Sequence, residues 1–571
     1  MEREVKQTDV LVVGGGAAGI IAAIEAHDNG AKVILANKGP FGRDSAAIWM
    51  AGWGFQAALY PPDSLENHVK DTIEGGKFLN NQALVNTFLA LAPRAIEDLS
   101  KWGMRLAKDG EKYKQYILPG QSLPRNPNHV RLGLMLGSEY RKVLPPQVRK
   151  RKNIEVIDDL FIFDLLGNDD EISGAIGIDL TTGTPLTIQA KTTIMATGGF
   201  MGCYNFMTSS STLTGDGHGA AYRAGVKMTG MEFTQFMPTT ALWPEVVRGD
   251  LYPYNLLNSL YAVFYNVLGD RFMERYYPEE KDWATREAAS RAIAKEVREG
   301  RGSPHGGAFL SLRHLPKNLI DGFLEKSKDS EFIKSLNKIG FDLKEDAIEV
   351  GPAVHYVQGG AWIDEKCRTN LGRLYAIGEL GSGGKDGADR LAGNSLPFCM
   401  GMAYIAGKDA AESSKSLNMP KLHDAQIEMF TKKLNSPVDR KEGVSPLEIK
   451  EKVRQTLQKC ALFQRNAADM KAGIKAIEAI KDDMLPRIST QAKSKIFNQE
   501  WIEALEAENM VDVAAMILNS ALMREESRGL HEREDFPEAD PKWLKHIIIK
   551  KVDGDMTFTV EPVTFPYVKP E

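Results

Sequence analysis

The chain has 571 residues, a length that predicts several structural units rather than one. Hydrophobic residues make up 43% of it and charged residues 26%, which is typical of globular proteins with large cores and argues against disorder. The net charge of −5 and the pI near 6.2 provide no basic excess, so nucleic acid is not an expected partner.

The cysteines and the apolar segments narrow the class further. The cysteines Cys203, Cys367, Cys399 and Cys460 lie at least 32 residues apart, so the sequence has no CxxC pair for zinc or an iron–sulfur cluster, and no metal site is expected. No stretch of 18 uncharged apolar residues and no apolar signal region is present. We therefore expect a soluble protein of a reducing compartment.

The first forty residues give the strongest local pattern. The β-branched run at 8–13 predicts a buried parallel strand, 20–26 follows with helical spacing, and 32–36 predicts the second strand of a βαβ unit. Between strand and helix, Gly14 permits a tight turn, Gly16 lets the backbone approach a pyrophosphate, and Gly19 lets the helix pack on the strand. The pattern predicts a dinucleotide site whose contacts are Gly14, Gly16, Ala17, Ala18 and Gly19, with flavin and nicotinamide both open.

The rest of the nucleotide domain is expected to be discontinuous. The acid that usually binds ribose after the second strand is missing, and Asn37 with Lys38 stands there; Asn37 can still hydrogen-bond a ribose hydroxyl. Two later strands run into glycine turns, at 192–200 with Thr197 and Gly198, and at 374–379. The region 228–350 resembles an inserted α+β module, 425–524 is charged and helical, and 543–560 predicts a short sheet.

Several ordered segments together resemble one family of flavoproteins. They are Gly14–Gly19, Thr214–Gly217, Arg271–Tyr276, Thr285–Glu287 with Ser290–Ala292, Glu299–Gly302, His355–Tyr356 with Gly359–Gly360, Ala376–Glu379, Ala388–Leu391 with Asn394–Leu396, and Glu526–Gly529. The family comprises the flavoprotein subunits of fumarate reductase, succinate dehydrogenase and L-aspartate oxidase. The α subunit of adenylylsulfate reductase is a more distant member. The resemblance covers nearly the whole chain.

The resemblance implies an α/β fold with FAD as cofactor. Its parts would be a discontinuous Rossmann-like FAD-binding domain at 1–227 and 351–420, a capping domain at 228–350 inserted in it, a C-terminal helical domain at 421–535, and a tail with short strands at 536–571. The implied chemistry is hydride transfer between flavin N5 and a C=C or CH–CH unit of a carboxylic acid. The same resemblance gives the catalytic residues: Arg286 as proton donor, His355 and Arg390 as the carboxylate-binding pair, and Glu245 with Arg248 on the proton path.

The resemblance also assigns residues to the flavin. Ser395 would cap a helix beginning at Leu396, whose positive end faces the flavin pyrimidine ring, and Glu379 would bind the ribose. Further flavin-side residues are Asp216, Ser45, Ala46 and Arg390. Where the membrane-bound members carry Ser-His-Thr with a flavin-linked histidine, this sequence has Ser45-Ala46-Ala47. Non-covalent FAD is therefore expected, which favours reduction or an oxidase reaction over succinate oxidation.

Two departures concern the substrate. The family's His-Pro-Thr is Met237-Pro238-Thr239 here, and Pro244 stands in place of a threonine, so two donors to a second carboxylate are lost. An aromatic segment at 251–265 is expected either to line a larger apolar pocket or to fill the core of the cap. An unsaturated acid with an apolar or aromatic far end is predicted to be preferred over fumarate.

Other functions remain open from the sequence. They are an adenylylsulfate reductase, an L-aspartate oxidase, and an electron-transfer subunit whose substrate pocket has lapsed. Since the sequence contains no cluster motif and no second dinucleotide fingerprint, an iron–sulfur partner subunit is expected to supply electrons. The expected location is the cytoplasm, or the membrane periphery where a partner anchors the complex.

Overall fold

The structure, a computed structural model, describes residues 4–43, 45–49, 54–128, 130 and 137–570. Its largest sheet has the order β7-β2-β1-β10-β9-β8, with β17 paired to β10. The strands are β1 (Glu4–Val13), β2 (Val33–Ala36), β7 (Ile154–Ile157), β8 (Leu160–Gly167), β9 (Ile172–Asp179), β10 (Thr184–Met195) and β17 (Leu374–Ala376). Strands β7, β2, β1, β10 and β17 are parallel. Because β17 comes from the second nucleotide segment, the domain is discontinuous, as predicted.

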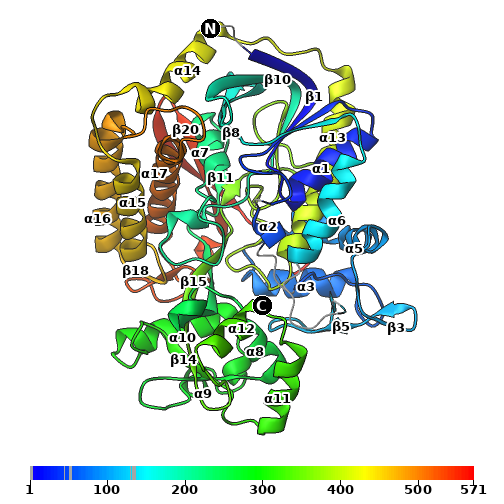
Figure 1. Ribbon diagram of the computed structural model, residues 1–571, viewed down its shortest axis with the longest axis vertical. Helices are drawn as coiled ribbons and strands as arrows, with labels where there is room; N and C mark the ends of the chain where they lie inside the picture. The colour runs from blue at the N-terminus through cyan, green and yellow to red at the C-terminus, as the bar shows by residue number, and fades with distance from the viewer. Residues whose placement is uncertain (1–3, 44, 50–53, 129, 131–136, 571) are drawn as a thin grey trace.

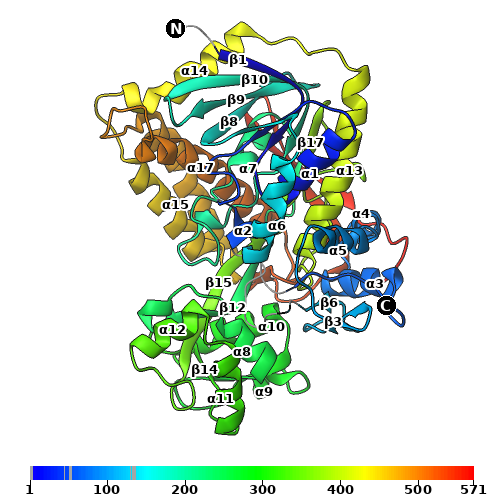
Figure 2. The same ribbon diagram turned by 45° about the vertical axis from the view of Figure 1, so that its right-hand side comes forward.

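Helices cover this sheet and the approach to its carboxyl ends. They are α1 (Ala17–Asp28), α2 (Ala46–Trp49), α3 (Leu65–Gly75), α4 (Gln82–Leu89), α5 (Ala92–Lys101), α6 (Gly137–Arg149), α7 (Asp216–Arg223) and α13 (Ser395–Ser416). Figures 1 and 2 show α1 and α13 side by side. A Cβ on Gly407 of α13 would lie 2.6 Å from the carbonyl oxygen of Ala22, so glycine permits this close packing.

The inserted cap is built on a second, antiparallel sheet of order β12-β15-β14-β13. Its strands are β12 (Thr234–Trp243), β13 (Val263–Tyr265), β14 (Ala308–Ser311) and β15 (Ile348–Val357), and its helices are α8 (Pro253–Leu260), α9 (Met273–Tyr276), α10 (Arg286–Arg298), α11 (Lys317–Lys326) and α12 (Glu331–Lys338). The cap has its own apolar core. Strands β12 and β15 connect it to the nucleotide domain (Figure 2), and β15 crosses the expected boundary at 350.

The C-terminal part combines helices with a small sheet. The helices are α14 (Asp424–Asp439), α15 (Pro446–Cys460), α16 (Ala467–Ala479) and α17 (Gln499–Met523). The helical region predicted at 425–524 is divided among these four helices. In the tail, β20 (Lys545–Val552) and β21 (Asp555–Pro562) form the expected short strands, and β20 pairs with β11 (Met228–Thr229), which also pairs with β16 (Gly360–Ala361). The start of the inserted module at Met228–Thr229 therefore pairs directly with the tail, and β16 joins the same sheet through β11.

Candidate active site

A long cavity extends from the first glycine turn to the cap, and Gly14, Gly16, Ala17 and Ala18 line its beginning. Gly14 has a φ of +110°, and a Cβ there would lie 2.3 Å from the carbonyl oxygen of Ala196. A Cβ on Gly19 would lie 1.8 Å from the carbonyl oxygen of Gly14, so these two glycines are needed for the turn itself. Within the described part of the chain, a Cβ on Gly16 would meet nothing closer than Ser45, at 3.7 Å, and Gly16 therefore leaves space at the cavity.

The residues after β2 support this turn from the side. Asn37 accepts a hydrogen bond from the backbone of Gly15 at 2.9 Å and donates to the carbonyl of Gly39. Lys38 lies 2.7 Å from Asp216 and also pairs with Glu506 of α17. Burial alone would lower the pKa of Lys38, but the two carboxylates raise it above its ordinary value. Asn37, Lys38 and Asp216 all line the cavity, yet their side chains are already bonded to the protein.

The polar atoms along this part of the cavity fit a dinucleotide. The N-terminus of α1 has no side-chain cap and no acidic residue in its first turn, so its N–H groups are free for a pyrophosphate. The hydroxyls of Thr197 and Ser209 are buried without a hydrogen-bond partner among the described residues, and both line the cavity beside Gly198. Glu379 lines it too; burial raises its pKa to about 7, although the backbone N–H of Val357 donates to it at 2.9 Å.

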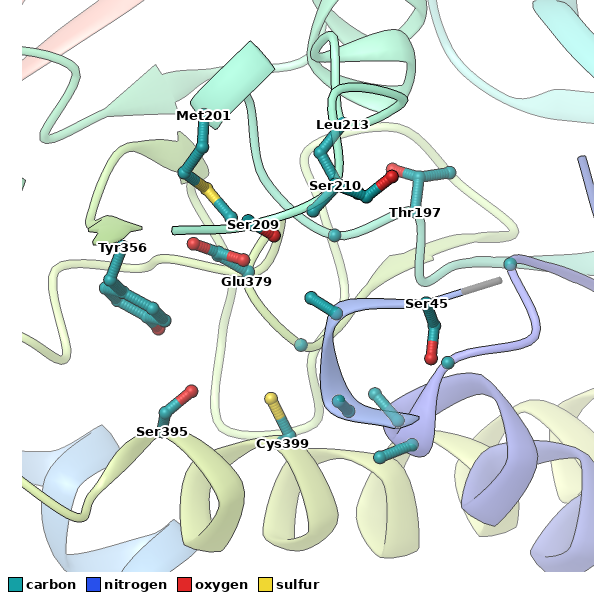
Figure 3. A pocket seen from close by; sticks show the side chains of 18 of the residues that line it. Ser45, Thr197, Met201, Ser209, Ser210, Leu213, Tyr356, Glu379, Ser395 and Cys399 are labelled. Atoms are coloured by element: carbon teal, nitrogen blue, oxygen red, sulfur yellow. The ribbon is translucent and has the colours of Figure 1, made fainter. Parts of the chain in front are cut away.

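The start of α13 differs from the prediction in one detail. The helix begins at Ser395, and Asn394 occupies the cap position without a side-chain capping bond, so Ser395 is not the N-cap. Asn394 cannot cap the helix because its side-chain amide is already hydrogen-bonded to His68 at 2.9 Å and to Thr72 at 2.8 Å. Ser395 and Leu396 nevertheless line the cavity. In Figure 3 the side chains of Ser395 and Cys399 project from α13 toward it.

At the far end of the cavity, the structure brings together three predicted catalytic residues from three elements. Arg286 is the first residue of α10, His355 lies on β15, and Arg390 lies in the loop before α13. Nη2 of Arg286 and Nε of Arg390 are buried and have no hydrogen-bond partner in the described part of the chain. The side chain of Thr208 holds Nδ1 of His355 at 2.8 Å.

The electrostatics of this end follow from the crowding of positive groups. Burial and the charge of Arg390 lower the pKa of Arg286 to about 10. Burial, Arg286 and Arg390 together lower the pKa of His355 well below its ordinary value, so the imidazole is neutral. Arg390 lies 4.3 Å from the ring centroid of Tyr356, which partly compensates its charge. Two cations and a neutral imidazole thus face the cavity.

Glu245 and Arg248 are not brought to this place. Both are exposed, around the short helical turn Glu245–Val247, and neither lines the cavity. Arg248 donates to the carbonyl of Leu242 at 3.3 Å and lies over the ring of Phe206. The cap positions this loop at its surface, so the structure does not connect the predicted proton path to Arg286.

Two groups beside these cations, Gln235 and Asp389, are not among the residues predicted from the sequence. Gln235 of β12 accepts from Nη2 of Arg390 at 2.7 Å and donates to Oδ1 of Asp389 at 2.7 Å. Burial and the nearby charge of Glu287 raise the pKa of Asp389 to about 7. Gln235 could have been found from the sequence by its spacing from Met237. Residues two apart on a strand share a face, and Met237 is already a candidate from the sequence. In the sequence, Asp389 is visible only as part of the segment Ala388–Leu391 that carries the family resemblance.

The aromatic segment of the cap divides between the two roles expected for it. Leu251 and Tyr254 line the cavity together with Met237. The remaining large residues belong to the core of the cap, for example Tyr252, which stacks on Phe332 at a centroid distance of 4.9 Å. Tyr261 is exposed and contributes to neither.

Among the described residues, no group of three or more His, Cys, Asp or Glu side chains is arranged to hold a metal ion. No helix there combines the length and apolar character needed to cross a bilayer.

A cavity that starts at a glycine turn and ends at two arginines and a histidine is that of an FAD-dependent oxidoreductase, and comparisons with known proteins agree. Residues 9–396 match the FAD binding domain model, and 450–571 match the fumarate reductase flavoprotein C-terminal model. One of the subunits of the fumarate reductase (CoM/CoB) of Methanothermobacter marburgensis is 34% identical over 96% of this chain and 98% of its own length. The succinate dehydrogenase flavoprotein subunit of Rickettsia bellii is 31% identical over 99% of this chain and 96% of its own length.

Solved structures agree as well. Mycobacterium smegmatis Sdh1 superposes with a TM-score of 0.87 at 31% identity, over 99% of this chain and 96% of that one. A mutant of E. coli quinol fumarate reductase gives 0.90 at 27% identity, over 99% of both chains. The chain belongs to the family of fumarate reductase and succinate dehydrogenase flavoprotein subunits, and its cofactor is FAD. Archaeoglobus fulgidus adenylylsulfate reductase, at 19% identity and a TM-score of 0.82, shares the fold.

Proposed function

We propose that the enzyme transfers hydride between FAD and the C=C or CH–CH unit of a carboxylic acid, with Arg286 as the proton donor. The observation that carries the proposal is the pair of buried nitrogens without partners among the described residues, Nη2 of Arg286 and Nε of Arg390, at one end of the cavity. Leaving charged donors buried and unpaired is costly, so the site suits an acidic substrate whose carboxylate pairs with Arg390 and whose reacting carbons lie beside Arg286. FAD, when bound, supplies the hydride acceptor and donor at N5.

Arg390 and His355 are the proposed carboxylate receivers. Gln235 fixes Nη2 of Arg390, which leaves its Nε for an anion. Thr208 holds Nδ1 of His355, and when its hydroxyl donates there, Nε2 carries the proton and donates to the same carboxylate. A carboxylate anchored in this way takes up the negative charge that develops when hydride reaches the far carbon of the double bond.

Arg286 is proposed to protonate the other carbon. Burial and Arg390 lower its pKa to about 10, so it remains protonated near neutral pH but releases its proton more readily than a free arginine. Its Nη2, which has no partner in the described part of the chain, is the atom proposed to donate the proton. Arg286 is the first residue of α10, and the side chain of Thr285 caps the N-terminus of this helix. This position fixes the guanidinium at the side of the cavity that the inserted domain forms.

Electron supply and cofactor attachment follow from the same family. Relatives are named as subunits, which supports the supply of electrons by a partner protein. We propose that this partner is an iron–sulfur protein, because the cysteines of this chain lie far apart in the sequence and three of them are buried. Ala46, at the position where membrane-bound members carry the linking histidine, lines the cavity and has no nucleophilic nitrogen, which supports non-covalent FAD.

The test is a stopped-flow screen. The protein is reduced with dithionite under anaerobic conditions and mixed with unsaturated mono- and dicarboxylic acids, with iminoaspartate, and with adenylylsulfate. Reoxidation by unsaturated acids, abolished in the double variant Arg286→Ala/Arg390→Ala, supports the proposal. Reoxidation by iminoaspartate alone, reoxidation by adenylylsulfate alone, or no reoxidation by any of these compounds would replace it with one of the other three functions.

A further inference from the structure

Tyr254 lines the cavity and carries a hydroxyl that no group in the described part of the chain uses. It lies on α8, its side chain is 9% exposed, and it lines the cavity. Its hydroxyl is buried without a hydrogen-bond partner in the described parts of the chain. Buried tyrosines normally find a partner, because an unsatisfied hydroxyl costs free energy. An acceptor on a bound substrate would supply that partner.

Tyr254 lines the same cavity as the proposed catalytic groups Arg286, His355 and Arg390. Its hydroxyl, like Nη2 of Arg286 and Nε of Arg390, is buried without a partner in the described part of the chain. When Arg390 and His355 hold the carboxylate of a substrate and its reacting carbons lie beside Arg286, its far end meets the other cap residues of the lining, Met237, Leu251 and Tyr254.

The surroundings of Tyr254 determine what kind of acceptor it can receive. Met237 and Leu251 line the cavity and pack in the same apolar cluster, and the backbone N–H of Tyr254 donates to the carbonyl of Leu251 at 3.0 Å. A second carboxylate at this end would lose its hydration and gain one neutral donor, which does not compensate the buried charge. An uncharged oxygen needs only one hydrogen bond.

We propose that Tyr254 is a specificity residue that donates to an uncharged oxygen at the far end of the substrate, such as a ketone, ester or amide carbonyl. The substrate class is then an unsaturated monocarboxylic acid with such an oxygen at a short distance beyond the double bond. This inference rests on the proposed function, and it revises the sequence-based expectation of a wholly apolar far end.

The experiment uses acids matched in size: (E)-4-oxopent-2-enoate with a ketone, (E)-4-methylpent-2-enoate with an apolar group, and fumarate. Each reoxidises the reduced holoenzyme of the wild type, of Tyr254→Phe, and of the matched control Tyr252→Phe. Tyr252 is the neighbouring tyrosine, and it packs in the cap core outside the cavity. Binding of the saturated pair 4-oxopentanoate and 4-methylpentanoate to the oxidised protein gives a readout independent of turnover.

The expected result is a loss of about tenfold in kcat/KM for the keto acid and in affinity for 4-oxopentanoate in Tyr254→Phe, the size of one hydrogen bond to a buried acceptor. The apolar acid should be unchanged within about twofold, and Tyr252→Phe should change neither. Equal losses for keto and apolar acids, or no loss, would overturn the inference while leaving the proposed function intact. If fumarate is the best acid for the wild type and loses most in Tyr254→Phe, the hydroxyl serves a second carboxylate and the inference fails. If no acid reoxidises the wild type, it is the proposed function that fails.

Discussion

The side-chain amide of Gln235 donates to Oδ1 of Asp389 at 2.7 Å, although the two residues lie 154 positions apart in the sequence. The same amide accepts from Arg390, so one neutral side chain joins a carboxylate to a substrate-side cation. Asp389 also interacts electrostatically with Arg286, and its negative charge raises the pKa of that guanidinium. Since burial raises the pKa of Asp389 itself to about 7, its charge is present mainly above neutral pH.

Asp389→Asn should therefore change the pH profile of reduction. Asparagine keeps an oxygen for the Gln235 bond but removes the negative charge, so the protonated form of Arg286 loses support and the pKa of Arg286 falls below its value of about 10. The alkaline limb, where Arg286 loses its proton, should move to lower pH. The measurement is kcat for reduction of the best acid between pH 6 and 11. The control is Glu534→Gln, which removes an exposed carboxylate paired with Arg298 and should leave the alkaline limb in place. An unmoved limb in Asp389→Asn would show that Asp389 and Arg286 are not coupled.

Arg286→Ala should leave FAD content and ligand affinity nearly intact while kcat falls by at least about 10²-fold, the range expected for loss of a general acid. Arg286→Lys should recover part of the rate, because an ammonium can still donate a proton. Steady-state kinetics and titration with a saturated acid separate the two effects. Arg298→Ala, at the exposed end of the same helix, is the matched control. An unchanged kcat with a raised KM would make Arg286 a binding cation only.

Gly16→Val should give a folded protein that does not retain FAD. The new side chain has room beside the described residues, because among them only Ser45 lies within 4 Å of its Cβ, but it occupies the space proposed for the pyrophosphate. Gly19→Val should instead fail to fold, since its Cβ would lie 1.8 Å from a backbone oxygen. Flavin absorbance per chain and circular dichroism distinguish the two. Stoichiometric flavin in the Gly16 variant would mean that the phosphates bind elsewhere.

FAD should be released intact by acid or heat. Ala46 lines the cavity at the linkage position and cannot form a bond to the flavin. The check is the supernatant after acid precipitation, analysed for FAD, together with a denaturing gel viewed under ultraviolet light. Fluorescence on the protein band would reveal a covalent link through another residue. Restoring a histidine by Ala46→His tests whether the position alone is sufficient for attachment.

The sequence by itself determined the features that depend on local spacing. The turn from Gly14 to Gly19, the strands on either side of it and the helices of the C-terminal domain follow from periodicity and from positions where only glycine fits. The candidates Arg286, His355 and Arg390 came from ordered motifs, each short enough to be visible in the chain.

Only the tertiary structure decided which side chains meet. In the folded protein, Glu245 and Arg248 lie on the surface. The side chain of Asn394 hydrogen-bonds to α3 and does not cap α13. The tertiary structure also brought Tyr254 of the cap insert into the same cavity as Arg390, 136 residues later in the chain. The physical reason is that local propensity fixes strands and helices, whereas long-range packing fixes the direction of each side chain. Whether a polar atom is satisfied depends on neighbours that lie far away in sequence.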